Sequence, residues 1–277
     1  MKKVQWISFV AAYLSGILFL LPLLWTLVSA FKPESSIMSY PPEWIPRSIT
    51  MVNFSEVLHK FAFMRWILNS FVVASLSTIG VIIIDSLAAY ALARLHFAGQ
   101  KILMVVIVSM LLVPTQVDII PLFLLFSKVH LTDTYMSLIF PTLAHVTGVY
   151  LLTQFFRQIP VELEEAAKID GCGFFRMWIQ IILPISKPIL STVAIITFVF
   201  SWNNFLWPLI VTNSDAVKTL PVGIAQFMGA SSGSNGSAPQ YGITLAGALM
   251  ATAPSIIIFF ALQRFFVRGI SSAGIKG

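Results

Sequence analysis

Residues 67–93 read ILNSFVVASLSTIGVIIIDSLAAYALA, a run of 27 residues in which Asp85 is the only charged side chain. At 1.5 Å per residue, a helix of this length exceeds the roughly 30 Å of a bilayer's hydrocarbon core. The stretch therefore predicts a transmembrane helix. Five further apolar runs of spanning length lie on either side of it, at roughly 7–30, 102–126, 135–157, 185–211 and 243–266. We therefore expect an all-α, polytopic membrane protein with six transmembrane helices.

The composition supports a membrane protein. Of the 277 residues, 57% are hydrophobic and only 10% are charged, and the mean hydropathy is +0.89. An aqueous globular domain has too little interior to hide so much apolar surface. The net charge of +6 comes from short basic clusters between apolar runs, so membrane topology explains it and nucleic acid is not an expected partner. A single cysteine, Cys172, allows no internal disulfide and no Cys/His metal set.

Basic residues in the connections indicate the orientation, because positive charge resists translocation. Alternate connections hold 11 and 6 of the 17 Lys and Arg residues. We expect the richer side, with the short turn from Arg94 to Lys101, to be cytoplasmic, and both termini to lie on that side of the cell membrane. The other side carries a Pro-rich aromatic segment, residues 40–46, and a long connection, residues 215–241, that ends in Ser and Gly.

The connection between the fourth and fifth expected spans is the most patterned segment. Residues 159–171 read IPVELEEAAKIDG. Pro160 at the first position, acids in the first turn and Gly171 just past the end predict one short helix outside the membrane. From these signals alone, a docking helix and a plain connecting helix are both possible.

One face of this expected helix has small residues at its centre. Leu163, Ala166, Ala167 and Asp170 recur at helical spacing, which would let another surface approach closely. Asp170 is unfavourable at a helix C-terminus unless it caps a following helix that starts near Phe174.

The spacing of this segment resembles the EAA loop, residues 160–184 here, of permease subunits of binding-protein-dependent ABC importers. Seven specified positions fall within twenty residues: Glu165-Ala166-Ala167, Gly171, Ile181 and Leu183-Pro184. The coupling residues expected from this resemblance are Glu164, Glu165, Ala166, Ala167, Asp170, Gly171, Leu183 and Pro184.

The resemblance extends over nearly the whole chain, to carbohydrate-importer permeases related to the second membrane subunit of the maltose system. The matching segments are Phe31-Lys32-Pro33, Asn69-Ser70, AAYALAR at 88–94, Trp202-Asn203 and the tail GISSAGIKG at 269–277. The tail differs slightly from the common form GLTAGAVKG but keeps its length and its Gly and Lys positions.

This resemblance implies a type I ABC importer permease fold and a division of labour. The chain would pair with a homologous permease, bind two ATPase subunits on the cytoplasmic face and receive a sugar, a di- or oligosaccharide, from an extracytoplasmic binding protein. The EAA helix would be the coupling helix, and the tail residues Gly274, Lys276 and Gly277 would contact the ATPase. A loop within 215–241 would reach the binding protein.

The chain lacks the loop that holds ATP. No Gly-x-x-x-x-Gly-Lys-Ser/Thr sequence occurs in it, so ATP and Mg²⁺ are expected in the partner ATPase and no cofactor is expected in this chain. We therefore expect a non-catalytic subunit with three parts: an N-terminal span and outer loop (1–65), a permease domain (66–267) and a cytoplasmic tail (268–277).

Polar side chains at membrane depth need a partner or a water-lined path. Asp85 is either a pathway residue or, as we favour, the acceptor of a structural hydrogen bond. Asn203 and Asn204 beside Trp202 and Trp207 are either a sugar-facing cluster or an interfacial anchor. Gln116 and Asp118, between Pro114 and Pro121, mark either an unwound segment or the outer end of the third span.

Alternative functions remain at this stage. The substrate class includes glycerol phosphate and polyols as well as sugars. A self-sufficient secondary transporter often shows inverted repeats and ionisable midplane sites, and we detect no convincing repeat. A membrane enzyme lacks support, because no nucleophile, metal or paired-carboxylate set is evident.

Overall fold

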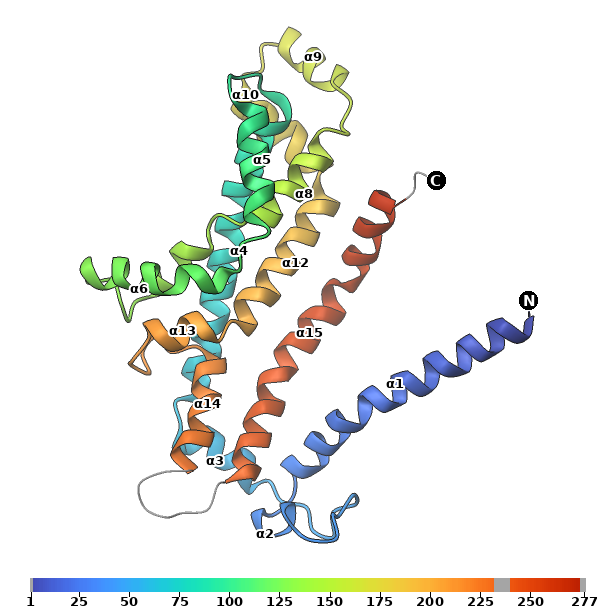
Figure 1. Cartoon of the computed structure of the whole chain (residues 1–277), viewed down its shortest axis with the longest axis vertical. Coiled ribbons are helices and arrows are strands. Elements are labelled where there is room, and N and C mark those ends of the chain that lie inside the picture. The colour runs from blue at the N-terminus through green and yellow to red at the C-terminus, as the bar shows by residue number, and fades with distance from the viewer. Residues whose placement is uncertain (1, 232–239, 275–277) are drawn as a thin grey trace. The chain divides into compact units, whose positions relative to one another are not determined.

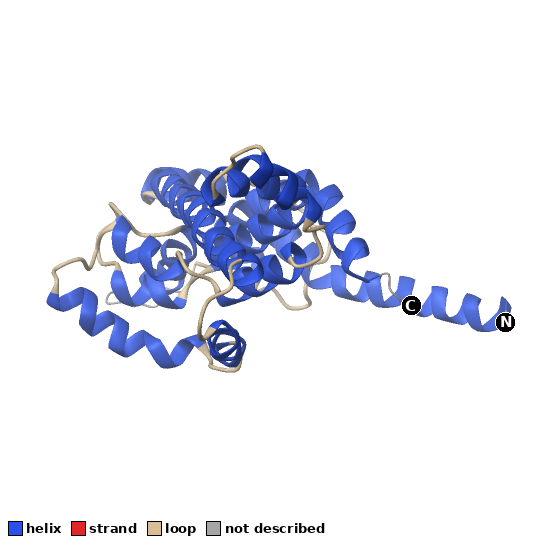
Figure 2. Cartoon of the chain, turned by 90° about the horizontal axis from the view of Figure 1, so that it is seen from above, coloured by secondary structure: helices blue, strands red, loops and turns tan. Residues whose placement is uncertain are grey.

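The computed structural model describes residues 2–231 and 240–274. Every regular element in these residues is helical (Figure 2). Two compact units are formed, the first by Met1–Trp66 and Leu220–Pro254 and the second by Ile67–Thr219 and Ser255–Gly277. The first unit holds α1 (Lys2–Ala30), α2 (Glu34–Ile37), α3 (Val52–Lys60) and α14 (Leu220–Ser231). Two helices, α4 (Phe63–Arg94) and α15 (Tyr241–Gly274), run from one unit into the other.

The second unit contains the remaining elements. They are α5 (Gln100–Met110), η1 (Thr115–Asp118), α6 (Ile119–Lys128), α7 (Tyr135–Ile139), η2 (Phe140–Thr142), α8 (Val146–Phe156), α9 (Glu162–Ile169), α10 (Phe174–Met177), η3 (Trp178–Ile182), α11 (Leu183–Ile185), α12 (Lys187–Asn203) and α13 (Leu206–Val211). In this unit α8 packs against both α5 and α12, and α9 lies at the end opposite α13 (Figure 1).

All six expected spans fall on helices, but three of them are broken. Ala12–Ala30 of α1 and the whole of α4 are continuous and apolar enough to cross a bilayer. Three more spans are bent helix pairs, and α15 contributes the shorter apolar stretch Tyr241–Ile257. The pairs and their bends are Gln100–Met110 with Thr115–Lys128 (93°), Tyr135–Thr142 with Val146–Phe156 (41°) and Phe174–Ile185 with Lys187–Asn203 (83°).

The third span breaks where the sequence left two alternatives open. Pro114 has extended backbone angles and precedes η1, which contains both Gln116 and Asp118. Figure 1 shows α6 running crosswise to α5. Proline has no N–H to continue a helical ladder, which accounts for the break at this point. The expectation of one helix over 102–126 is therefore wrong, because the chain breaks between Met110 and Thr115 and places Gln116 and Asp118 in a short 3-10 turn.

Two other sequence expectations also need correction. The fifth span does not continue to residue 211, because α12 ends at Asn203 and α13 is a separate helix. The connection at 215–241 is not loop throughout, because α14 occupies Leu220–Ser231. Buried side chains at Leu220 and Val222 hold α14 in the first unit. There, a Cβ on Gly223 of α14 would overlap the ring of Trp66, near the start of α4, so α14 packs closely against this tryptophan.

The first unit is held by polar contacts around the Phe31-Lys32-Pro33 turn. Asn53 Nδ2 donates to the carbonyls of Ala30 and Lys32, at 2.9 Å each. The buried Lys32 ammonium donates to the carbonyl of Glu43 and lies 4.2 Å from the centroid of the Trp25 ring. A buried cation needs such partners, so this lysine orders the segment between α1 and α3.

Two apolar clusters form the core of the second unit. One gathers side chains from α4, α8, η3 and α12: Val81, Ala89, Tyr90, Leu152, Phe156, Ile159, Trp178, Ile182 and Val193. The other joins α4 to α6, α7 and α13: Val73, Phe126, Leu138, Trp207 and Val211. Because α4 contributes to both clusters, it is the common packing partner of the shorter helices.

Polar side chains of α4 reach the segment 135–145 at three levels. The Tyr135 hydroxyl donates to Asn69 Oδ1 at 2.6 Å. Thr142 and Ser77 are joined by a hydroxyl hydrogen bond of 2.8 Å. The backbone N–H of His145 donates to Asp85 Oδ1 at 3.0 Å. Since both segments run in the same chain direction through these contacts, they lie roughly parallel.

A separate contact ties the connection before α7 to the connection after α13. Asp133 has a positive φ of 58°, and its Oδ1 accepts the N–H groups of Asn213 at 2.8 Å and Ser214 at 3.0 Å. Burial raises the pKa of the Asp133 carboxyl, but these two N–H groups and the charge of Lys218 lower it more, so the pKa lies below its ordinary value.

This contact predicts a pH-dependent loss of stability. A lowered folded-state pKa stabilises the fold above the unfolded pKa of about 4, and that stability is lost as pH falls through the folded value. Asp133→Asn keeps an acceptor and tolerates the positive φ but carries no charge. We expect it to reduce thermal stability in detergent at pH 7 by about 1 kcal/mol, and the difference to shrink as pH falls below about 4 and through the lowered folded-state pKa. A constant difference over that pH range would contradict this account.

Candidate functional site

The EAA segment forms an eight-residue helix with a defined end. α9 begins at Glu162, two residues after Pro160, because the carbonyl of Val161 accepts the first N–H groups of the helix. Gly171 has a φ of +77° and follows the C-cap residue. Its N–H donates to the carbonyl of Lys168 at 3.0 Å, and the N–H of Cys172 donates to that of Ala167 at 2.9 Å. These two bonds form a Schellman motif.

Two local expectations for this helix are wrong. Pro160 is not its first residue, because the helix begins at Glu162. Asp170 does not cap the next helix, because the N-cap of α10 is Gly173, which has no side-chain cap. Asp170 is instead the C-cap of α9 and is exposed.

The two faces of α9 differ in exposure. Glu164 and Ala167 are buried. Leu163, Glu165 and Ala166 are exposed, as is the Asp170 that follows them. The small-residue stripe expected from the sequence is therefore mostly on the outer face, with Ala167 alone turned into the protein. The exposed face combines small, acidic and apolar side chains, which suits contact with another protein surface.

Sequence reasoning missed the partners of the buried acid. Glu164 Oε1 lies 2.7 Å from Arg94 Nε, and the two side chains are 6% and 8% exposed. The Tyr90 hydroxyl donates to Glu164 Oε2 at 3.4 Å. Arg94 also donates through Nη2 to the carbonyl of Ile159. The sequence signal for this partner was the end of the second span, AAYALAR at 88–94, where one arginine ends an otherwise apolar run.

The second half of the EAA loop continues toward α12. A π-helical turn, η3, directly precedes α11, which contains Pro184. Leu183 packs against the core cluster of α4, α8 and η3, whereas Pro184 is exposed. Pro184 has no N–H to donate within the helix, and both prolines and π-helical turns are typical of points where a helix bends. The chain turns by 83° between this segment and α12.

Asp85 lies inside the second unit and is fully buried. Its Oδ1 accepts the N–H of His145, the residue that precedes α8, and its Oδ2 has no hydrogen-bond partner among the described residues. A Cβ on Gly148 would overlap that Oδ2. A carboxylate in this position compensates an open N–H at the start of a helix, as a capping side chain does. The geometry favours the structural role over a pathway role.

The four expected sugar-facing residues do not form one surface. Trp202 is buried and stacks on Phe198, and Trp207 belongs to the α4, α6, α7 and α13 core, where its Nε1 donates to the carbonyl of Ser137 at 2.8 Å. Asn203 is exposed, but its amide donates to the carbonyl of Val199 within α12. Asn204 is half-buried at the C-cap of α12.

Of the expected tail contacts, Gly274 is the last residue of α15, and Lys276 and Gly277 lie outside the described residues. No group of three or more His, Cys, Asp or Glu side chains with metal-binding geometry occurs within residues 2–231 and 240–274.

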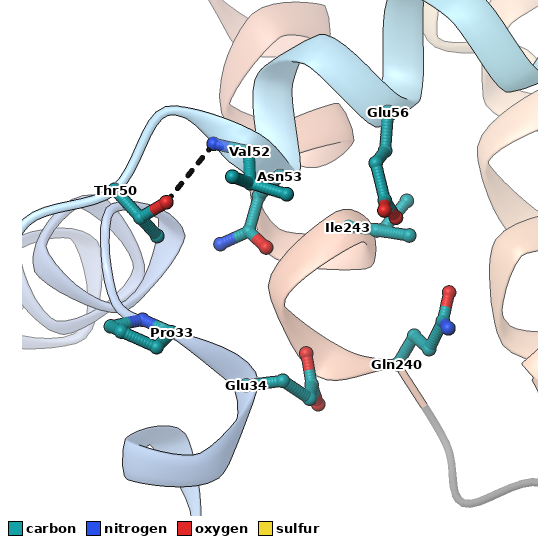
Figure 3. A pocket seen from close by; sticks show the side chains of 8 residues that line it. All are labelled: Pro33, Glu34, Thr50, Val52, Asn53, Glu56, Gln240 and Ile243. Atoms are coloured by element: carbon teal, nitrogen blue, oxygen red, sulfur yellow. Dashed lines mark hydrogen bonds between the residues drawn. The ribbon is translucent and has the colours of Figure 1, made fainter.

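The first unit contains a small pocket of about 280 Å³ (Figure 3). It is lined by Pro33, Glu34, Thr50, Val52, Asn53, Glu56, Gln240 and Ile243. The Glu34 carboxylate accepts the N–H groups of Tyr241 and Gly242 at 2.7 Å each and so caps the N-terminus of α15. Glu56 pairs with Lys60 at 3.0 Å. Both acids therefore have partners, which gives this pocket a structural role.

The positive φ of Gly171 leads to a testable prediction. A Cβ there would meet no atom within 4 Å, so Gly171→Ala is opposed only by the left-handed backbone, which costs about 1–2 kcal/mol. We expect faster hydrogen exchange of the α9 amides and no change elsewhere. The matched control is Gly173→Ala, whose φ of −75° suits any residue and where a Cβ also meets no atom. Equal exchange in the two variants would exclude a role for the Gly171 conformation.

The fold and site together define a class of protein: a helical membrane protein with a short helix, α9, that is exposed on one face and fastened to α4 on the other. Residues 82–272 match the model of the family described as binding-protein-dependent transport system inner membrane component. The chain belongs to this family.

Curated relatives match over nearly their full length. A putative ABC transporter permease protein, ORF2, of Caldicellulosiruptor sp. (strain Rt8B.4) is 38% identical over 258 residues, which cover 92% of this chain and 91% of the relative. The arabinooligosaccharides transport system permease protein AraQ of Halalkalibacterium halodurans is 33% identical, again covering 92% and 91%. The sn-glycerol-3-phosphate transport system permease protein UgpE of Yersinia pestis bv. Antiqua is 33% identical with the same coverage.

A solved structure shares the fold. A chain of a bacterial ABC transporter involved in the import of the acidic polysaccharide alginate superposes with a TM-score of 0.82 at 20% identity, covering 96% of this chain and 98% of that one. The all-α, type I importer permease fold expected from the sequence is thereby confirmed, and the protein is an inner membrane component of an ABC transporter.

Proposed function

We propose that this chain is one of two permease subunits of an ATP-driven importer for a di- or oligosaccharide. The observation that carries the proposal is the outer face of α9. Glu165, Ala166 and Leu163 are exposed on a short helix whose other face is fastened to the spans. A helix so exposed and so anchored suits a coupling helix seated in a cleft of a separate ATPase.

The partners follow from the same assignment. A homologous second permease completes the translocation pathway, two ATPase subunits bind ATP and Mg²⁺ at the cytoplasmic face, and an extracytoplasmic binding protein delivers the sugar. Exposed apolar side chains along α1, whose span is only 6% buried, suit contact with lipid or with the second permease. This chain itself performs no catalysis in the proposal, and both of its termini are cytoplasmic.

The sugar assignment is supported by the relatives. AraQ is named for arabinooligosaccharides, and the alginate transporter for an acidic polysaccharide. UgpE is named for sn-glycerol-3-phosphate, which makes a glycerol phosphate the second candidate substrate. In this chain the candidate sugar-contacting amides are those of Asn203, which is exposed, and Asn204, which is half-buried at the end of α12. Trp202 and Trp207 are buried and therefore have no direct contact with the sugar in this proposal.

Uptake by the purified complex tests the proposal. We expect a second permease and an ATPase to co-purify with the chain from native membranes. Proteoliposomes of this complex with the binding protein should take up a labelled arabinooligosaccharide only with ATP on the ATPase side, and should do so in the presence of a protonophore. Uptake of sn-glycerol 3-phosphate instead would select the second substrate. Uptake by the lone chain that requires a proton gradient would contradict the proposal.

The exposed acid gives the matching variant. Glu165→Lys reverses a charge on the outer face of α9 without disturbing a buried contact. We expect ATPase binding to weaken by about tenfold or more, equivalent to about 1.4 kcal/mol. Co-purification of the ATPase at the level of the unsubstituted protein, with unchanged uptake, would exclude Glu165 from the contact.

A further inference from the structure

The two neighbouring acids of α9 have opposite surroundings. Glu165 is exposed, whereas the Glu164 side chain is 6% exposed and forms an ion pair with Arg94. Successive residues on a helix point about 100° apart, so one acid can face a partner while the next faces the protein. Glu164 is therefore directed away from the face that an ATPase would cover.

The ion pair joins three elements. Arg94 ends α4, and its guanidinium holds both the Glu164 carboxylate on α9 and the carbonyl of Ile159, which follows α8. Tyr90, one turn earlier on α4, donates its hydroxyl to the same carboxylate. The planar, many-donor guanidinium is suited to bridging two acceptors in fixed directions, which a lysine ammonium does less well.

The surroundings of the pair make it hard to break. Tyr90 and Ile159, which contact the pair, belong to one apolar cluster with Phe156 and Trp178. In such surroundings an unpaired charge is strongly destabilising, and a buried pair that loses one partner costs about 3–5 kcal/mol. The carboxylate and the guanidinium therefore stay together, and α9 moves with the end of α4.

Residues of α4 that precede Arg94 also contact the segment that leads to α9. The contacts of Asn69 with Tyr135, Ser77 with Thr142 and Asp85 with His145 precede the Arg94 contact along the chain. Four polar contacts thus fasten α4 to residues 135–164 from one end to the other. A displacement of α9 is therefore transmitted to the last turn of α4, and from there along α4 to the other three contacts.

We propose that Glu164 is a positioning residue for coupling: with Arg94 it fixes the coupling helix to α4, so that movement imposed by the ATPase is delivered to α4 directly. This inference rests on the proposed function. It gives the two acids separate roles, with Glu165 facing the ATPase and Glu164 holding the helix to the membrane part. The elbow at Gly171 toward α12 is then a second connection, not the sole one.

The test uses a paired apolar substitution. Arg94→Met with Glu164→Met removes both charges, keeps long side chains and leaves no buried charge without a partner, an exchange that buried ion pairs often tolerate. In the reconstituted complex we expect the ATPase to co-purify at the usual level and to hydrolyse ATP. Sugar taken up per ATP should fall by about tenfold, within the usual range of coupling between sites.

A readout without transport separates this proposal from the proposed function. Hydrogen exchange of the lone permease should show faster exchange of the amides at 162–169 in the double variant and unchanged exchange in residues 69–85 of α4. If the unsubstituted complex shows no ATP-driven uptake, the proposed function fails, while the exchange result still tests the anchor. Unchanged exchange in α9 would overturn the anchor.

Single variants complete the experiment. Glu165→Gln is the matched control one residue away, and it should leave the α9 exchange unchanged. Arg94→Lys keeps the charge but loses the two-acceptor geometry, so we expect an intermediate loss of sugar per ATP, and it stands in for the double variant if that variant does not fold. Full coupling in either Arg94 variant would overturn the positioning role.

Discussion

A helix broken inside a membrane leaves backbone N–H and C=O groups that hydrocarbon cannot satisfy. In this protein the fourth span is broken between α7 and α8, and the unbroken helix α4 lies against it. Asp85 accepts the N–H of His145 at the break, and Ser77 bonds to Thr142 just before it. The polar side chains of α4 thus allow a broken span to persist, and they hold both halves of it against α4.

Contacts with α4 also explain how a helix as short as α9 is held in place. Eight residues form too few hydrogen bonds to be stable alone in water. α9 is stabilised by its Schellman end at Gly171, by the burial of Ala167 and by the ion pair of Glu164 with Arg94. Because these contacts already order α9, its exposed face can contact a partner protein without a further loss of conformational entropy in the helix.

Much of the fold followed from pattern alone. Apolar runs placed all six spans on helices, and the spacing from Glu165 to Pro184 indicated the family, which the relatives confirm. The helix α14 was missed because a short apolar helix bounded by a Ser- and Gly-rich stretch gives no spanning signal. The break at Pro114 was left open because a proline can either end a span or interrupt it.

By itself, the sequence determined that the chain lies in a membrane, roughly where its apolar helices fall and to which family it belongs, because hydrophobic length and short-range spacing are properties of neighbouring residues. Only the tertiary structure decided that Glu164 faces Arg94 while Glu165 stays exposed, and that Trp207 is a core residue. These outcomes depend on contacts between residues 65–75 positions apart, and no local pattern records which distant side chain will fill a given space.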